Sequence, residues 1–72
     1  MTNERADAAF IALDRYSIDK DGPGSSPVET AEIEEAMIDL IADLKYLARR
    51  EGVDFNAVLR MAGQHYFEEA GA

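Results

Sequence analysis

Four carboxylates recur along one stretch of the chain at a spacing that could support chemistry. They are separated by three, four and four residues, which places them on one face if the stretch is an α-helix. Three interpretations of this row remain open. It is a solvated face that keeps the protein soluble, a row that docks on a basic protein surface, or a magnesium site, because Mg²⁺ accepts one or two carboxylates together with water and substrate phosphates. The four residues are Glu32, Glu35, Asp39 and Asp43.

The first two carboxylates of the row, Glu32 and Glu35, have the spacing E-x-x-E. This spacing resembles the first motif of MazG-type nucleotide pyrophosphohydrolases, helical enzymes that hold Mg²⁺ with E-x-x-E on one helix and E-x-x-D on the next. The resemblance implies a Mg²⁺-dependent hydrolase as an alternative function. The second motif is missing, because Asp39 and Asp43 are four residues apart and lie in the same stretch. We therefore predict no catalytic residue and no cofactor for this protein, and Mg²⁺ would be needed only in this alternative.

The only histidine, His65, is the other residue that could take part in catalysis. Glu68 and Glu69 follow three and four residues later, where they could pair with its imidazolium on a helix. No serine, threonine or cysteine lies near it in the sequence to act as a nucleophile. We therefore interpret His65 as a structural or exposed residue.

The net charge restricts the class of partner. Fifteen acidic and seven basic residues give a formal charge of −8 over 72 residues. Such a charge repels nucleic acid and anionic membranes, so we expect neither as a direct partner and expect a basic protein surface instead. The chain has no cysteine and no apolar run of the roughly 18 residues that a membrane span needs. We therefore predict a cytoplasmic protein.

The carboxylate row lies in the stretch that organises the fold, and this stretch is predicted to be a helix over residues 27–51. Ser26 and Glu29 have the spacing of a capping box, and Gly52 follows the last turn, where glycine commonly ends a helix. Between these signals the apolar residues recur with the period of an amphipathic helix. They are Ile33, Met37, Leu40, Ile41, Leu44, Leu47 and Ala48.

A third helix is predicted over residues 54–69, with Asp54 as its N-cap. Val53 and Val58 have the spacing of a hydrophobic staple across that cap. Because the link to the preceding helix is so short, we expect the two helices to form an antiparallel hairpin that supplies the core. Gly63 lies inside this helix at a cost of about 1 kcal/mol, which close approach of another helix would explain.

The N-terminal part is predicted to form a first helix over residues 3–16, capped by Thr2 or Asn3. Residues 17–27 contain Gly-Pro-Gly and two serines, which favour a flexible connector. The whole chain, residues 1–72, is therefore predicted to be one all-α domain of three helices. A chain of this length buries only about 60% of its unfolded surface.

Small domains with so limited a core usually depend on a disulfide, a metal or a partner subunit. The chain has no cysteine and one histidine, which excludes a disulfide, a thiolate metal site and a multi-histidine site, so self-association remains and we predict a homodimer. Ile38, Ile41 and Phe67 lie opposite or at the edges of the predicted core faces. We expect these three residues to contribute to the dimer or partner interface.

From Asp39 onward the chain resembles a group of short, acidic, mostly uncharacterised proteins of phages, plasmids and bacteria. They share roughly D-L-x-x-D-L-x-x-L-A-x-x-x-G-x-D-F, followed by A-x-x-H-Y-x-x-E. A helix hairpin explains most matched positions but not Asp43, His65 and Glu69, which are candidates for a shared function. The matched residues are Asp39, Leu40, Asp43, Leu44, Leu47, Ala48, Gly52, Asp54, Phe55, Ala62, His65, Tyr66 and Glu69.

This second resemblance implies no reaction. It implies an origin in a mobile element, whose small acidic proteins often bind and inhibit host machinery. We therefore predict a non-enzymatic interaction module that binds a basic partner surface. The most specific version of this prediction is an inhibitor that mimics nucleic acid. The alternatives are the Mg²⁺-dependent hydrolase and a purely structural dimer or assembly subunit.

Overall fold

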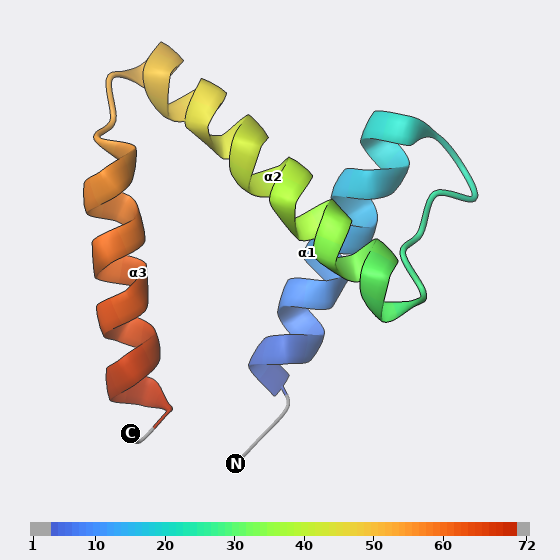
Figure 1. Cartoon of the computed structure of the whole chain (residues 1–72), viewed down its shortest axis with the longest axis horizontal. Coiled ribbons are helices and arrows are strands. Elements are labelled where there is room, and N and C mark those ends of the chain that lie inside the picture. The colour runs from blue at the N-terminus through green and yellow to red at the C-terminus, as the bar shows by residue number, and fades with distance from the viewer. Residues whose placement is uncertain (1–3, 71–72) are drawn as a thin grey trace. The chain divides into compact units, whose positions relative to one another are not determined.

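The computed structural model describes residues 4–70 and contains three α-helices (Figure 1). They are α1 (Glu4–Asp21), α2 (Thr30–Glu51) and α3 (Phe55–Glu69). No strand occurs within residues 4–70, which confirms the predicted all-α class. None of the helices in this range has the length and apolar character needed to cross a membrane.

The described residues form two compact units, and α2 belongs to both. The N-terminal unit comprises residues 4–43, and the C-terminal unit comprises residues 44–70, so the boundary falls between Asp43 and Leu44. The N-terminal unit therefore contains α1, the connector and the first part of α2. The C-terminal unit contains the end of α2, a short link and α3.

Helix α1 is longer than predicted, because it continues to Asp21 rather than ending at residue 16. The Gly22 N–H donates to the Ile18 carbonyl at 2.8 Å, and Gly22 has a φ of 97°. Glycine adopts this left-handed conformation readily, so the helix ends there. The first five residues of the predicted connector are therefore helical. The predicted caps Thr2 and Asn3 lie outside the described residues.

The buried residues of the N-terminal unit are few and come from α1 and the connector. Leu13 and Ser17, one turn apart on α1, are each 5% exposed. Pro27 is also buried, although the sequence predicted it as the first residue of the second helix. The connector therefore returns to the interior of the unit at Pro27.

Helix α2 begins at Thr30, three residues later than predicted. The Glu32 Oε1 atom accepts hydrogen bonds from the backbone N–H groups of Val28 and Glu29, both at 3.0 Å. A glutamate in the first turn that reaches back to preceding N–H groups is half of a capping box. The predicted box of Ser26 and Glu29 is thus shifted by three residues, and Glu32 takes the role expected of Glu29.

The link between α2 and α3 has the predicted form. The Val53 N–H donates to the Ala48 carbonyl at 2.8 Å, and the Gly52 N–H donates to the Arg49 carbonyl at 3.4 Å. Gly52 has a φ of 71°. These two bonds and the left-handed glycine make a Schellman motif, which confirms the predicted end of α2.

Helix α3 is capped as predicted, but none of its residues is buried. The Asp54 side chain accepts from the Ala57 N–H at 3.2 Å and so forms the N-cap. Val58, which the sequence predicts as part of a hydrophobic staple, and Leu59 next to it remain 44% and 47% exposed. Within its own unit, a Cβ added at Gly63 would meet no described atom within 4 Å, so the expected close approach of another helix stays a prediction. The hairpin core stays a prediction.

Candidate functional site

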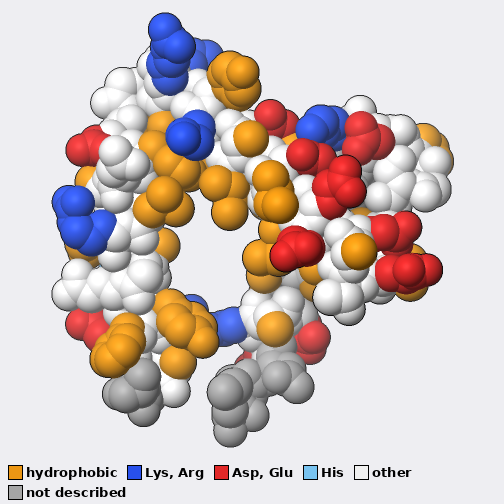
Figure 2. Space-filling model, viewed as in Figure 1, with side chains coloured by type: hydrophobic (Ala, Val, Ile, Leu, Met, Phe, Trp, Pro, Cys, Tyr) orange, Lys and Arg blue, Asp and Glu red, His pale blue; other side chains and the backbone are white. Residues whose placement is uncertain are grey.

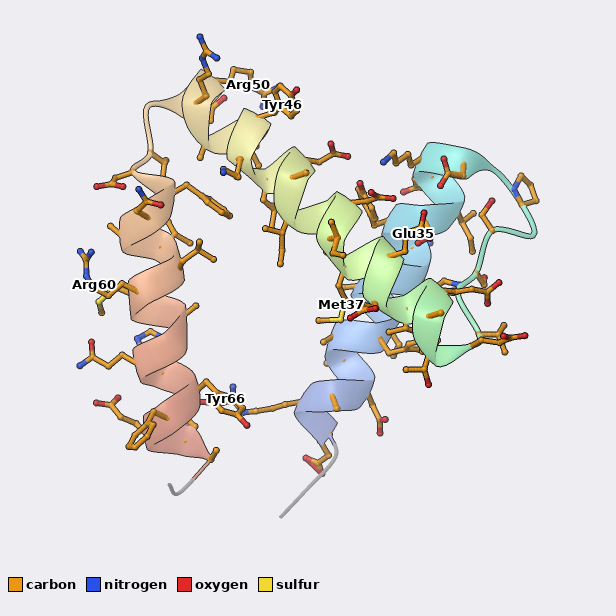
Figure 3. All side chains as sticks on the ribbon, in the orientation of Figure 1. Glu35, Met37, Tyr46, Arg50, Arg60 and Tyr66 are labelled. Carbon is orange, nitrogen blue, oxygen red and sulfur yellow. The ribbon has the colours of Figure 1, made fainter. Side chains whose placement is uncertain are left out.

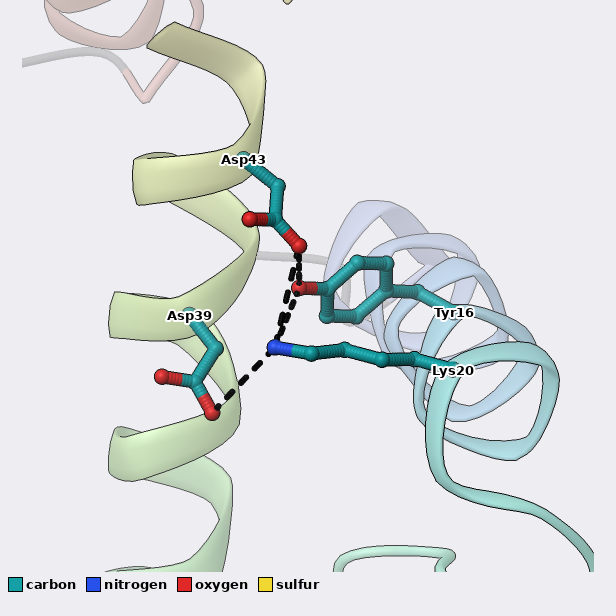
Figure 4. Close-up of polar contacts among 4 residues, drawn as sticks. All are labelled: Tyr16, Lys20, Asp39 and Asp43. Carbon is teal, nitrogen blue, oxygen red and sulfur yellow. Dashed lines mark hydrogen bonds and ion pairs between the residues drawn. The ribbon is translucent and has the colours of Figure 1, made fainter. Parts of the chain in front are cut away.

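Four polar side chains meet where α1 lies beside α2 (Figure 4). The Tyr16 hydroxyl donates to Asp43 Oδ2, and Lys20 Nζ donates to the Tyr16 hydroxyl at 3.2 Å. Lys20 Nζ also lies 3.7 Å from a carboxylate oxygen of Asp43 and 3.9 Å from one of Asp39. The last two carboxylates of the predicted row are therefore engaged by α1.

This network favours the protonated forms of both side chains from α1. The hydrogen bond to Asp43 raises the pKa of Tyr16 above its ordinary 10.0, and loss of solvent adds to the rise. The hydrogen bond with Tyr16 raises the pKa of Lys20 above 10.5, and attraction to Asp43 and Asp39 adds to it. At neutral pH one ammonium group therefore faces two carboxylates, and one negative charge is left over.

The first two carboxylates of the row differ in the contacts that they make. Glu32 is held at the start of α2, where the N–H groups of Glu29 and Val28 lower its pKa below the ordinary 4.5. The Glu35 side chain has no hydrogen bond or ion pair with any of the described residues. Three carboxylates of the row are thus bound by the chain itself, and Glu35 is the one that remains open.

Glu35 lines a hollow of about 230 Å³ between α1, the connector and α2. Its wall carries four carboxylates and no basic side chain, so its chemistry suits a cation. Ser17, which is 5% exposed, lies in the same wall. We call this feature the acidic hollow. Its lining residues are Tyr16, Ser17, Asp21, Gly24, Ser25, Ser26, Pro27, Glu32, Glu35, Ala36 and Asp39.

The charge of the protein is divided unevenly between the two units. Residues 4–43 contain eleven acidic and three basic residues, a formal charge of −8, whereas residues 44–70 contain four of each. Figure 2 shows acidic side chains gathered over α1 and the first part of α2, and Lys and Arg on the end of α2 and on α3. The N-terminal unit therefore carries the entire net charge of the chain.

The carboxylates within residues 4–70 show no cluster of the kind that holds a metal ion through three or more side chains. No group of three or more Asp, Glu or His side chains in this range is arranged to hold a metal ion. The reason is visible in their contacts, because Glu32 binds backbone N–H groups while Asp39 and Asp43 face Lys20. The Mg²⁺-dependent alternative gains no support from this arrangement.

The three polar residues of the phage-like pattern fall in different units. Asp43 belongs to the network with α1, whereas His65 and Glu69 lie on α3 in the C-terminal unit. His65 is exposed and lines a hollow of about 510 Å³ beside Val58 and Met61. A shared role of the three residues stays a prediction.

The three residues predicted for an interface are all exposed. Ile38, Ile41 and Phe67 expose 60%, 42% and 61% of their surface. Ile41 lines an apolar hollow of the N-terminal unit, but Ile38 does not. Their participation in an interface stays a prediction.

Tyr16 and Lys20 are the site residues that the sequence did not indicate. Because the first helix was predicted to end at residue 16, Lys20 was placed in a flexible connector. Their spacing of four residues was the available signal, since it brings two side chains together when the helix continues. Helix propensity alone does not reveal that they meet carboxylates of α2.

Comparisons of the chain with protein-family models, with curated proteins and with solved structures found no match. Both resemblances stated from the sequence therefore stay predictions. A function is therefore inferred from the geometry of the acidic hollow.

Proposed function

We propose that this protein is a small, acidic, non-enzymatic interaction module that binds a basic partner surface through the acidic hollow. The observation that carries the proposal is Glu35, a carboxylate without a partner among the described residues, in a wall that has no basic side chain. An arginine side chain of the partner is the expected occupant. Its planar guanidinium offers five N–H donors and binds carboxylates in pairs.

The hollow is a narrower docking site than the predicted row of four carboxylates. Asp43 is already bound by Tyr16 and Lys20, and it does not line the hollow. Nucleic-acid mimicry needs a long open row, so it receives less support than insertion of one or two basic side chains. Inhibition of host machinery, which the phage-like resemblance implies, would use the same surface.

The unequal charge of the two units supports the same proposal. A charge of −8 within residues 4–43 attracts a basic partner over distances up to the Debye length, about 8 Å at physiological ionic strength. The hollow then supplies short-range contacts that a diffuse negative surface lacks. Binding is therefore expected to be salt-dependent and yet localised.

The test is a titration of the isotope-labelled full chain with a short arginine-rich peptide, followed by NMR. We expect saturable shifts of amides around the hollow, including Ser17, Ser25 and Glu35. Glu35→Lys should weaken binding by about tenfold or more. Glu34→Lys changes the charge equally on the same helix but outside the lining, so its affinity should stay within about twofold of wild type.

Two outcomes would contradict the proposal. If the shifts spread over all carboxylates without saturating, the peptide senses only the net charge. If Glu34→Lys weakens binding as much as Glu35→Lys, the hollow has no special role.

A further inference from the structure

The wall of the acidic hollow contains a hydroxyl group that the chain leaves without a partner. Ser17 on α1 is 5% exposed, yet its side chain forms no hydrogen bond with any of the described residues. No polar side-chain atom that residues 4–70 enclose completely lacks a hydrogen bond. The Ser17 hydroxyl is therefore not enclosed, and it opens into the hollow that Ser17 lines. Such a hydroxyl is available as a hydrogen-bond partner to a group that enters the hollow.

Two open carboxylates lie in the same wall, one from each helix. Asp21 on α1 and Glu35 on α2 both line the hollow, and neither side chain forms a hydrogen bond or ion pair within residues 4–70. Asp21 follows Ser17 by four residues, so the two lie on one face of α1. Figure 3 shows Glu35 on the part of α2 that lines the hollow together with α1. The open acceptor groups therefore come from both helices.

The other two carboxylates of the hollow are engaged by the chain itself. Glu32 accepts hydrogen bonds from two backbone N–H groups at the start of α2, both at 3.0 Å. Asp39 has an oxygen 3.9 Å from Lys20 Nζ, and Lys20 does not line the hollow. Both carboxylates add negative charge, but the contacts to a ligand fall to the Ser17 hydroxyl and the two open carboxylates.

The hollow has the size of one basic side chain. Its volume of about 230 Å³ corresponds to about eight water molecules at their share of the liquid. The buried Pro27 and the half-buried Ala36 also line it. They offer an apolar surface to the methylene groups of an arginine or a lysine, while the charged end meets the polar wall. Size therefore admits either side chain, and the hydrogen bonds decide between them.

The carboxylates of the hollow do not converge on one point. No group of three or more Asp, Glu or His side chains within residues 4–70 is arranged to hold a metal ion. An ammonium group is likewise a compact charge, with its donors on a single atom. A guanidinium spreads its donors over a plane and can pair with a carboxylate along one edge while other N–H groups remain free. Separated acceptors on two helices therefore favour a guanidinium.

We propose that Ser17 and Asp21 complete a guanidinium site with Glu35, so that the acidic hollow selects arginine over lysine. This inference rests on the proposed function, because a basic side chain of a partner must enter the hollow. Glu35 and Asp21 accept N–H groups from different edges of the guanidinium, and the Ser17 hydroxyl accepts a further one. A lysine ammonium satisfies only part of this set, because its three donors share one nitrogen.

The first test compares two peptides by NMR titration of the isotope-labelled full chain. One is the arginine-rich peptide, and the other has lysine in place of every arginine, so length and charge are equal. We expect the arginine peptide to bind at least about tenfold more tightly. If the lysine peptide binds as tightly or more tightly, the inference is overturned and the proposed function stands. If neither peptide gives saturable shifts around the hollow, the proposed function fails and the inference fails with it.

The second test removes the hydroxyl with Ser17→Ala, which suits α1 because alanine is the strongest helix former. The affinity for the arginine peptide should fall by about tenfold, and that for the lysine peptide should change by less than about twofold. The ratio of the two affinities is the informative quantity, because a general loss of structure weakens both peptides alike. A ratio that stays at its wild-type value would overturn the role of Ser17.

A matched pair of substitutions at the end of α1 tests Asp21. Asp21→Asn and Asp19→Asn each remove one negative charge, but Asp19 does not line the hollow and pairs with Arg15 at 3.5 Å. Asp21→Asn should weaken binding of the arginine peptide by about fivefold or more, whereas Asp19→Asn should leave it within about twofold of wild type. Equal effects of the two substitutions would mean that only net charge matters, and would overturn the role of Asp21.

Discussion

The hydroxyl of Tyr16 on α1 donates a hydrogen bond to the carboxylate of Asp43 on α2, and so joins residues 27 positions apart in sequence. Lys20 reinforces this contact by donating to the same hydroxyl at 3.2 Å. Asp43 is the last residue of the N-terminal unit, so the contact lies within that unit. The end of α1 is thereby fastened to the middle of α2.

Removing this hydroxyl should destabilise the N-terminal unit in a way that depends on alkaline pH. The pKa values of Tyr16 and Lys20 are raised above 10.0 and 10.5, so their stabilisation is present below pH 10. It is lost as the pH rises through the raised values, when Tyr16 ionises beside Asp43. Tyr16→Phe should therefore melt at a lower temperature than wild type at pH 7, and the difference should narrow above pH 10.

The control for this experiment is Tyr66→Phe, since Tyr66 is 73% exposed and its hydroxyl forms no hydrogen bond within residues 4–70. Its melting temperature should follow that of wild type at every pH. Equal melting temperatures of Tyr16→Phe and wild type at pH 7 would show that the contact adds nothing to stability.

The sequence was most informative where a signal is local. The end of α2 at Gly52 and the cap at Asp54 follow from the residues within one turn, and both are confirmed. The start of α2 was misplaced because Ser26 and Glu29 have the residue types and spacing of a capping box, whereas the bond that forms joins the Glu29 N–H to the Glu32 carboxylate. A capping rule finds a helix end but does not choose between overlapping candidates.

The candidate site was harder to predict, because it depends on contacts between distant residues. The row of four carboxylates was recognised, but its division into bound and open members was not. That division follows from the longer α1, which brings Lys20 within 4 Å of Asp39 and Asp43. Helical spacing shows which residues share one face of a helix. It does not show which side chains of another helix contact that face.

The start of α2 should weaken in acid through Glu32. Its pKa is lowered below 4.5 by the N–H groups of Glu29 and Val28, so the stabilisation is present above pH 4.5 and is lost as the pH falls through the lowered value. Glu32→Gln should be less stable than wild type at pH 7, and the difference should shrink toward pH 3. Urea denaturation at several pH values measures it. A constant difference between pH 7 and 3 would contradict the assignment.

Two glycines should respond to alanine in opposite directions, because only one of them needs its special backbone conformation. Gly63 lies inside α3, and an added Cβ would meet no atom within 4 Å, so Gly63→Ala should stabilise the protein by about 1 kcal/mol. Gly52 has a φ of 71°, so Gly52→Ala should destabilise it by about 1–2 kcal/mol. Urea denaturation followed by circular dichroism measures both. If Gly63→Ala were destabilising instead, a second helix would have to approach that position in solution. The face that contains Gly63 differs from the face of Val58 and Met61, so such a result would place a contact on α3 away from the hollow that those two residues line.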